Sequence, residues 1–372
     1  MTLQVINNGT GPGDAGAETV YAAFAKAKAN FAELYGLYGS EVEAFTFTTK
    51  QNDLAVADYT RVVRWNGAGT TGITGIAAPS SGARILTIVN ATTDYLLWLE
   101  NQNTASAAAN RLMLPDGHWA PLMPGDTITV MYDGTAARWR VVSWPTRGAK
   151  MGFDLFLDAW DLTTTNRTAS LSGAGASAVV SGTGVSTTDK AKGCLSLATG
   201  TTTTGYAHHH NGSNAQMMST LGPYLMGYRV APSNLPDATD TFEIEIGLSQ
   251  RITTTAFASG ALWSLYWNGS AAEWRQRCGN AGVLTDSTTG SPTPGTSPVE
   301  LYIFINPAGT RADFLKSEDG VSVVLCTSQG GLPASSVAIG FQECCTKTAG
   351  TNSRSAIFDW RGYRVGNAEV RP

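Results

Sequence analysis

The sequence is poor in charged residues. Lys, Arg, Asp and Glu make up 15 % of its 372 residues, against about 25 % in an average soluble protein. Long surface helices depend on such side chains, so their scarcity argues against a helical protein. The net charge of −4 also excludes the basic surface needed to bind nucleic acid or an anionic membrane.

Cysteine is scarce as well, and its five positions lack the spacing of a metal site. Cys194, Cys278, Cys326, Cys344 and Cys345 include no CxxC pair. So few cysteines in so long a chain do not form a disulfide framework, and we expect them to be reduced and buried. Because no nucleotide, metal or nucleophile motif is present either, we predict no cofactor.

Long apolar runs are missing too. No stretch approaches the roughly 18 apolar residues of a membrane-spanning helix. The first residues, Met1 to Ile6, have neither the basic nor the apolar part of a signal peptide. We therefore expect a protein that is made in a cytoplasm and does not insert into a membrane. If it acts outside a cell, a route other than secretion must carry it there.

Small and aromatic residues are abundant instead. The chain contains 41 Gly, 10 Trp, 12 Tyr and 12 Phe. Small uncharged residues suit short strands and tight turns, and the aromatic side chains supply core volume. At about 150 residues per domain, the length predicts two or three domains. The composition therefore indicates an all-β protein.

The strand and turn signals divide the chain into three parts. Residues 1–40 form an anchoring arm and a helix, residues 41–147 a small β-sandwich or barrel, and residues 148–372 a larger sandwich. In the middle part, short alternating runs such as Thr127–Tyr132 are separated by turn signals. In the last part, about nine strand-like runs follow one another without helices between them, which favours an antiparallel jelly-roll sandwich over a parallel sheet.

An apolar seam marks the one helix, which we expect over residues 17–38. Its members are spaced alternately four and three residues apart: Val20, Phe24, Ala27, Phe31, Leu34 and Tyr38. This is the spacing of a coiled-coil interface, and a helix of about three heptads is marginal on its own. The partner is either the helix's own domain or identical helices around a three-fold axis. Because residues 40–60 show no large apolar face, we favour the trimer.

Two parts of the chain resemble structural proteins of bacteriophage fibres. Asn8–Gly16 and Asn30–Tyr35 are similar to the arm and helix that open many tail-fibre and tailspike proteins. Arg84–Asn90, Leu114–Gly117 and Tyr132–Val142 resemble a module that is common in phage fibres. Such modules serve as spacers or trimeric knobs.

The last third resembles a concanavalin-like or laminin-G-like sandwich. Thr241–Ile246 is similar to an early core strand of that fold, Val299–Ile305 to the first strand of an internal hairpin, and Ile357–Val365 to a closing strand. Residues 160–240 match no family in this way.

These resemblances imply a homotrimeric, non-enzymatic structural protein of the virion, made in the cytoplasm of the bacterial host. The favoured role is a tail fibre or receptor-binding adhesin that contacts host surface polysaccharide. Its N-terminal arm would attach it to other phage proteins. A head fibre or decoration protein on the capsid is the alternative. A polysaccharide depolymerase is the third interpretation, although the sequence lacks the short repeats of a long β-helix.

Aromatic residues around a hairpin signal are the candidates for glycan binding. Trp263, Trp267 and Trp274 surround Asn268-Gly269, a dipeptide typical of a two-residue turn. Sugars stack on aromatic rings, and Asn can bind hydroxyl groups. Trp263 and Trp267 are four residues apart and therefore share a face of a strand. The alternative is that these rings belong to the core.

His208, His209 and His210 are the candidate metal ligands. Three consecutive side chains of a strand cannot point at one ion, because their directions alternate. In a trimer, one His from each copy could meet on the axis and bind a transition metal. A polar loop, or a contact in packing or ligand binding, is the alternative.

Glu243 and Glu245 are the candidates for a catalytic pair, since concanavalin-like folds include glycosidases. Side chains at i and i+2 of a strand are about 6.5–7 Å apart, within the range of inverting carboxyl pairs. The similar enzymes have a third acid at a position that is Leu248 here. We therefore predict a solvent-facing pair and no enzyme.

Overall fold

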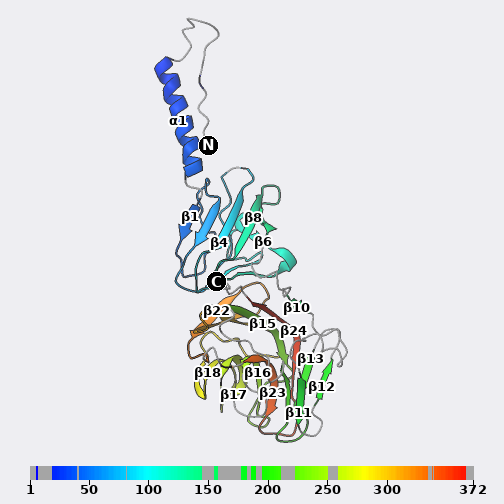
Figure 1. Cartoon of the computed structure of the whole chain (residues 1–372). Helices are drawn as coiled ribbons and strands as arrows, with labels where there is room; N and C mark the ends of the chain where they lie inside the picture. Colours follow the sequence, from blue (N-terminus) through cyan, green and yellow to red (C-terminus); the bar gives the residue numbers. More distant parts are fainter. Residues whose placement is uncertain are drawn as a thin grey trace.

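The computed structural model describes residues 6, 19–39, 42–80, 82–144, 155–157, 177–181, 186–189, 195–210, 223–249, 259–333, 337 and 339–365. Figure 1 shows a helix followed along the long axis of the molecule by a small β unit and then by a larger sandwich. The anchoring arm and the predicted boundary at 147/148 lie outside the described residues, and that boundary stays a prediction.

The helix α1 (Val20–Gly39) has 20 residues and matches the predicted helix closely. Thr19 caps its N-terminus, since the Thr19 Oγ1 accepts a hydrogen bond from the backbone N–H of Ala22 at 3.2 Å. The helix ends at Gly39, and Figure 1 shows it projecting from the small β unit. No helix in the described part of the chain is long and apolar enough to cross a membrane.

The small β unit consists of two sheets that pack face to face. The six-stranded sheet has the order β1 (Val42–Phe45), β2 (Val62–Trp65), β4 (Ile85–Asn90), β8 (Thr127–Asp133), β9 (Arg138–Ser143) and β6 (Leu112–Met113). The three-stranded sheet has the order β3 (Thr71–Ile73), β5 (Leu97–Leu99) and β7 (Ala120–Leu122), and the 3-10 helices η1 (Ala108–Asn110) and η2 (Pro115–Gly117) lie in the connections. Trp65 and Trp139 are buried between the sheets, which confirms the predicted small sandwich.

Several strands of the small β unit pair in parallel, which the sequence patterns did not reveal. β1 pairs with β2 and β2 with β4, while β3 pairs with β5 on the other sheet. Parallel neighbours need long connections, and here these connections consist of loops and of strands of the other sheet, with β3 between β2 and β4 and β4 between β3 and β5. Strands that follow one another within each sheet therefore run in the same direction at the start of this unit.

The sandwich consists of a seven-stranded and an eight-stranded sheet, and every pairing described within it is antiparallel. The seven-stranded sheet has the order β11 (Ser177–Ser181), β14 (Tyr206–His210), β23 (Gly340–Lys347), β16 (Phe242–Ser249), β17 (Gly260–Trp267), β18 (Ala272–Asn280) and β19 (Val283–Ser287). The eight-stranded sheet has the order β12 (Ser186–Asp189), β13 (Leu195–Ala198), β24 (Ser355–Val365), β15 (Tyr224–Pro232), β20 (Val299–Ile305), β21 (Ala312–Ser317) and β22 (Val324–Gln329), with β10 (Leu155–Leu157) paired to β24. This arrangement confirms the predicted all-β, concanavalin-like jelly roll.

The main core lies between the two sheets of the sandwich. Alternate residues of β16, such as Ile244 and Ile246, face Leu301 and Ile303 of β20 within one cluster of buried side chains. All seven residues of β20 are buried, because a second cluster covers the other face of this strand. That cluster joins Trp98 of the small β unit to residues of the sandwich, so the two β units share a core-like interface.

The cysteines behave as predicted wherever they are described. Cys278, Cys326, Cys344 and Cys345 are free and buried, whereas Cys194 lies outside the described residues. Burial raises the pKa of the Cys326 thiol to about 12, so this side chain is protonated at neutral pH and unreactive.

Candidate functional site

The apolar seam of α1 is exposed to solvent in the single chain. The exposed fractions of Val20, Phe24 and Phe31 are 72 %, 71 % and 57 %. Ala27 is partly buried, and the side chains of Leu34 and Tyr38 lie outside the described part of the helix. Their own subunit therefore leaves most of the surface of these three large side chains uncovered.

Two of the glycan-binding candidates are core residues. Trp263 and Trp274 are buried in the main cluster of the sandwich, where neither ring can meet a sugar. The Trp263 Nε1–H donates a hydrogen bond to the backbone oxygen of Tyr302 at 3.1 Å, and its ring lies edge-on to Phe314 with centroids 5.5 Å apart. The prediction was wrong for these two residues, because the face of the sheet on which both lie is the one that faces the core. Trp267, at the end of the strand, is partly exposed.

Asn268 forms the turn between β17 and β18. Its Oδ1 accepts hydrogen bonds from the backbone N–H groups of Ser270 and Ala271, both at 2.9 Å. Its Nδ2 donates to Glu273 Oε2, also at 2.9 Å. The hairpin signal is thereby confirmed. The Asn268 side chain shapes this turn, and its glycan contact stays a prediction.

The histidines belong to strand β14, not to a polar loop. His208 is buried, and in the sheet it lies between Val179 of β11 and Cys344 of β23. A side chain buried inside its own subunit cannot reach a three-fold axis, so the predicted axial metal site is wrong for His208. The side chains of His209 and His210 lie outside the described residues, and the described part of the chain contains no cluster of metal-binding residues.

A charged cluster lies on the outer face of the seven-stranded sheet. Glu243 and Glu245 alternate along β16 with residues that face the core, as the period of a strand requires. Next to them lie Ser264 of β17, Arg275 and Arg277 of β18, and Asp286 of β19, which we call the outer cluster together with the two glutamates. Sequence reasoning found only the glutamates. The alternation of Arg275 and Arg277 with buried residues of β18 was the available signal.

Ion pairs connect the outer cluster across three strands. Arg275 Nη2 lies 2.7 Å from Glu243 Oε1, and Arg275 Nη1 lies 3.1 Å from Asp286 Oδ2. Arg277 approaches both glutamates, at 3.3 Å and 3.6 Å from one oxygen of each, and its Nε lies 3.0 Å from Asp286 Oδ1. Glu245 is buried, so the prediction that both glutamates face solvent holds only for the partly exposed Glu243.

The aromatic side chain of Tyr266 borders the outer cluster on its hairpin side. The guanidinium carbon of Arg275 lies 3.8 Å from the ring centroid of Tyr266, a cation–π stack. The Tyr266 hydroxyl donates to Glu273 Oε2 at 3.3 Å, and burial, followed by the charge of Glu273, raises the pKa of Tyr266. Tyr266 and Glu273 are both partly exposed. This border offers a ligand an aromatic ring and polar groups next to one another.

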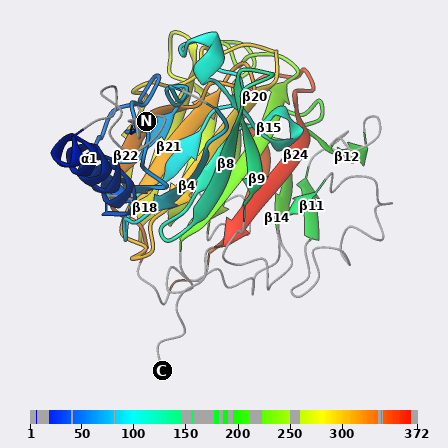
Figure 2. The same ribbon diagram turned by 90° about the horizontal axis from the view of Figure 1, so that it is seen from above.

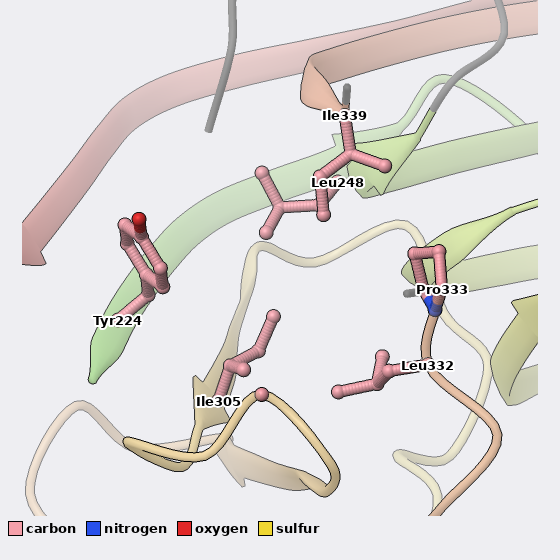
Figure 3. Close-up of a pocket in the computed structure, with 7 residues that line it drawn as sticks. Tyr224, Leu248, Ile305, Leu332, Pro333 and Ile339 are labelled. Carbon is pink, nitrogen blue, oxygen red and sulfur yellow. The ribbon is translucent and has the colours of Figure 1, made fainter. Parts of the chain in front are cut away.

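A small apolar hollow lies at one end of the main core (Figure 3). Its volume of about 10 Å³ is close to the smallest that can hold one water molecule. Burial raises the pKa of Tyr224, at one side of it, to about 12. The hollow is too small for a sugar, so it is a packing gap. The other residues that line it are Leu248, Ile305, Gly309, Leu332, Pro333 and Ile339.

No family model and no curated protein matches the sequence. Among solved structures, the chain is similar to the carbohydrate recognition domain of Emp46p in its metal-free form, with 8 % identity and a TM-score of 0.41 over 57 % of this chain and 95 % of that one. The similarity to the VIP36 exoplasmic/lumenal domain has 12 % identity and a TM-score of 0.37, over 53 % of this chain and 87 % of that one. The similarity to peanut lectin has 10 % identity and a TM-score of 0.35, over 51 % of this chain and 97 % of that one. TM-scores this low identify no family, and the fold is assigned from the strand order above.

Proposed function

We propose that this chain is a non-enzymatic structural protein of a bacteriophage particle, a homotrimeric fibre or receptor-binding adhesin that presents its sandwich to glycans of the host surface. The observation that carries the proposal is the exposed seam of α1. A chain that leaves Val20, Phe24 and Phe31 in water has a strong reason to associate through them, since burial of each side chain is worth about 1.5–3 kcal/mol.

A parallel bundle of three helices accounts for this seam better than a loose pair. The seam follows a heptad pattern, and 20 residues of helix are about 30 Å long, enough for nearly three heptads of contact. The bundle would leave the small β unit and the sandwich of each copy side by side. Several copies of one weak glycan site would then bind together, which raises the overall affinity of an adhesin.

The outer cluster supports a binding role over catalysis. A glycosidase needs one carboxyl group that donates a proton and one that acts as nucleophile or base. Glu243 and Glu245 instead share the guanidinium of Arg277, and Glu243 also pairs with Arg275. We therefore expect no reducing ends to be released when the protein is incubated with host surface polysaccharide. Release of reducing ends that is lost in Glu243→Gln would favour the depolymerase.

Light scattering tests the trimer directly. We expect a mass near three times 39.1 kDa for the wild-type protein. Phe24→Lys should give a monomer, because it places a charge in the seam. Ala25→Lys is the matched control, since Ala25 is exposed on the next helical position and lies outside the seam. A monomeric wild type, or equal masses for the two variants, would contradict the proposal.

Attachment to the tail and attachment to the capsid remain two versions of this proposal. The tail is favoured, with a head fibre on the capsid as the alternative, and in both the N-terminal arm holds the protein on the virion. Labelling of intact particles with an antibody against the sandwich separates the two, because the label would gather at the tail tip or over the capsid. Particles without label would contradict both versions.

A further inference from the structure

Exposed apolar side chains of the sandwich gather on one edge. Among the described residues of the sandwich, the large apolar side chains that are exposed are Val283, Leu284 and Val324, with exposed fractions of 75 %, 39 % and 43 %. Val283 and Leu284 belong to β19 and Val324 to β22. We call these three residues the sandwich edge.

The two strands of the sandwich edge are the last strands of the two sheets. β19 ends the seven-stranded sheet and β22 ends the eight-stranded sheet, so each has a described partner on one side only. They lie at the same end of the sandwich, since Gln329 at the end of β22 donates a hydrogen bond from Nε2 to the backbone oxygen of Gln276 in β18 at 3.3 Å. Proteins usually protect such edges with charged residues or Pro. Here Asp286 of β19 is paired with Arg275 and Arg277, and the three apolar side chains of the sandwich edge are exposed beside it.

The strands of the sandwich edge lie on the same side of the molecule as helix α1. Figure 1 shows α1, β1, β22 and β18 along the left side, and Figure 2, turned by 90°, again places α1, β22 and β18 on the left. β19 follows β18 directly in the sheet. Copies joined through α1 would therefore bring this side of the sandwich toward a common axis.

We propose that the sandwich edge packs against the neighbouring copy of this chain and forms a second interface of the trimer, distant from the helix bundle. This inference rests on the proposed trimer. Joining at α1 raises the effective concentration of the neighbouring edge to the millimolar range, at which a small apolar contact is sufficient. An unrelated partner would lack this advantage, and the apolar edge would favour aggregation without a defined occupant.

Photo-cross-linking of the full chain tests which surfaces meet. Benzoylphenylalanine at position 283 should yield covalent dimers and trimers under light. The control is the same group at position 203, because Thr203 is exposed in the loop between β13 and β14, away from the sandwich edge. If light scattering shows a trimer but position 283 cross-links no better than position 203, the second interface is absent. A monomeric wild type would instead overturn the proposed function, so the two failures are distinguishable.

Dilution of the trimer tests the energetic part of the proposal. Val283→Glu should fold normally, because Val283 is exposed, but its trimer should dissociate at a concentration about tenfold or more above that of the wild type. Val283→Thr keeps the shape and the strand propensity and should behave nearly as the wild type. Equal dissociation of Val283→Glu and the wild type would overturn the inference.

Discussion

Trp119 of the small β unit packs edge-on against Tyr302 of the sandwich, with ring centroids 4.9 Å apart and ring planes at 87°. Both rings are buried, together with Trp98 and Phe304, in the cluster between the two β units. Polar contacts surround this cluster. One of them joins Lys50 Nζ to the backbone oxygen of Val323 at 2.6 Å. The two β units therefore meet through an interface that resembles a domain core, so we expect them to unfold together.

Trp119→Ala should uncouple the two β units. Removal of a buried Trp side chain costs about 3–5 kcal/mol, and here the loss falls on the interface, leaving most of each unit's own core intact. Urea unfolding followed by fluorescence and circular dichroism should change from one transition to two. Tyr59→Ala is the control, since Tyr59 is exposed on the small β unit and its loss should have little effect. A single, unshifted transition in Trp119→Ala would contradict the shared interface.

Glu100 and Lys50 should show strong energetic coupling. Glu100 is fully buried and lies 2.6 Å from Lys50 Nζ. It also accepts hydrogen bonds from Trp98 Nε1 at 2.9 Å and from the backbone N–H of Val323 at 3.1 Å. Removal of one partner of a fully buried pair costs about 3–5 kcal/mol, and we expect less here because the Lys50 side chain is 31 % exposed. Glu100→Gln and Lys50→Met should each destabilise the protein in urea, and the double variant by clearly less than the sum. Additive losses would rule out the coupling.

Asp240 should contribute to acid sensitivity. A hydrogen bond from the Asn352 amide, and further contacts with Asn352 and Arg354, hold the pKa of this carboxyl below its usual 3.8. The unfolded chain therefore takes up the proton first. The stabilisation is present above about pH 4 and is lost as the pH falls through the lower native pKa.

Asp240→Asn should remove this part of the pH dependence. Urea midpoints of wild type and variant should differ most near neutral pH and converge below about pH 4. Glu318→Gln is the control, because Glu318 is exposed and its ion pair with Lys316, at 2.8 Å, is a surface pair of the kind that contributes little to stability. Parallel profiles for Asp240→Asn and the wild type would exclude the role of Asp240.

Trp267→Ala should affect binding to host cells, whereas Trp263→Ala should affect the stability of the fold. Trp267 is partly exposed at the end of β17, so its loss should weaken adsorption of the protein to host cells with little change in unfolding. Trp263 is a core residue, and its loss should cost about 3–5 kcal/mol in urea unfolding. Adsorption that stays the same in a folded Trp267→Ala variant would remove this residue from the glycan site.

Local patterns in the sequence determined the type and place of many elements. The seam spacing predicted the helix at residues 17–38, and it forms at Val20–Gly39. The apolar run at Val299–Ile305 predicted a strand, and β20 has these bounds. The low charge, the turn signals and the absence of βαβ alternation together indicated an all-β protein with a jelly-roll sandwich. Such features depend on near neighbours in the chain, so a periodic pattern is sufficient to reveal them.

Only the tertiary structure decided which face of each strand is buried. The spacing of Trp263 and Trp267 placed them on one face, but the opposite sheet makes that face the core. The charged partners of Glu243 and Glu245 come from β18, and Trp119, far away in sequence, covers the outer side of β20. A strand pattern fixes the alternation of its side chains, whereas burial depends on surfaces that distant segments bring to it.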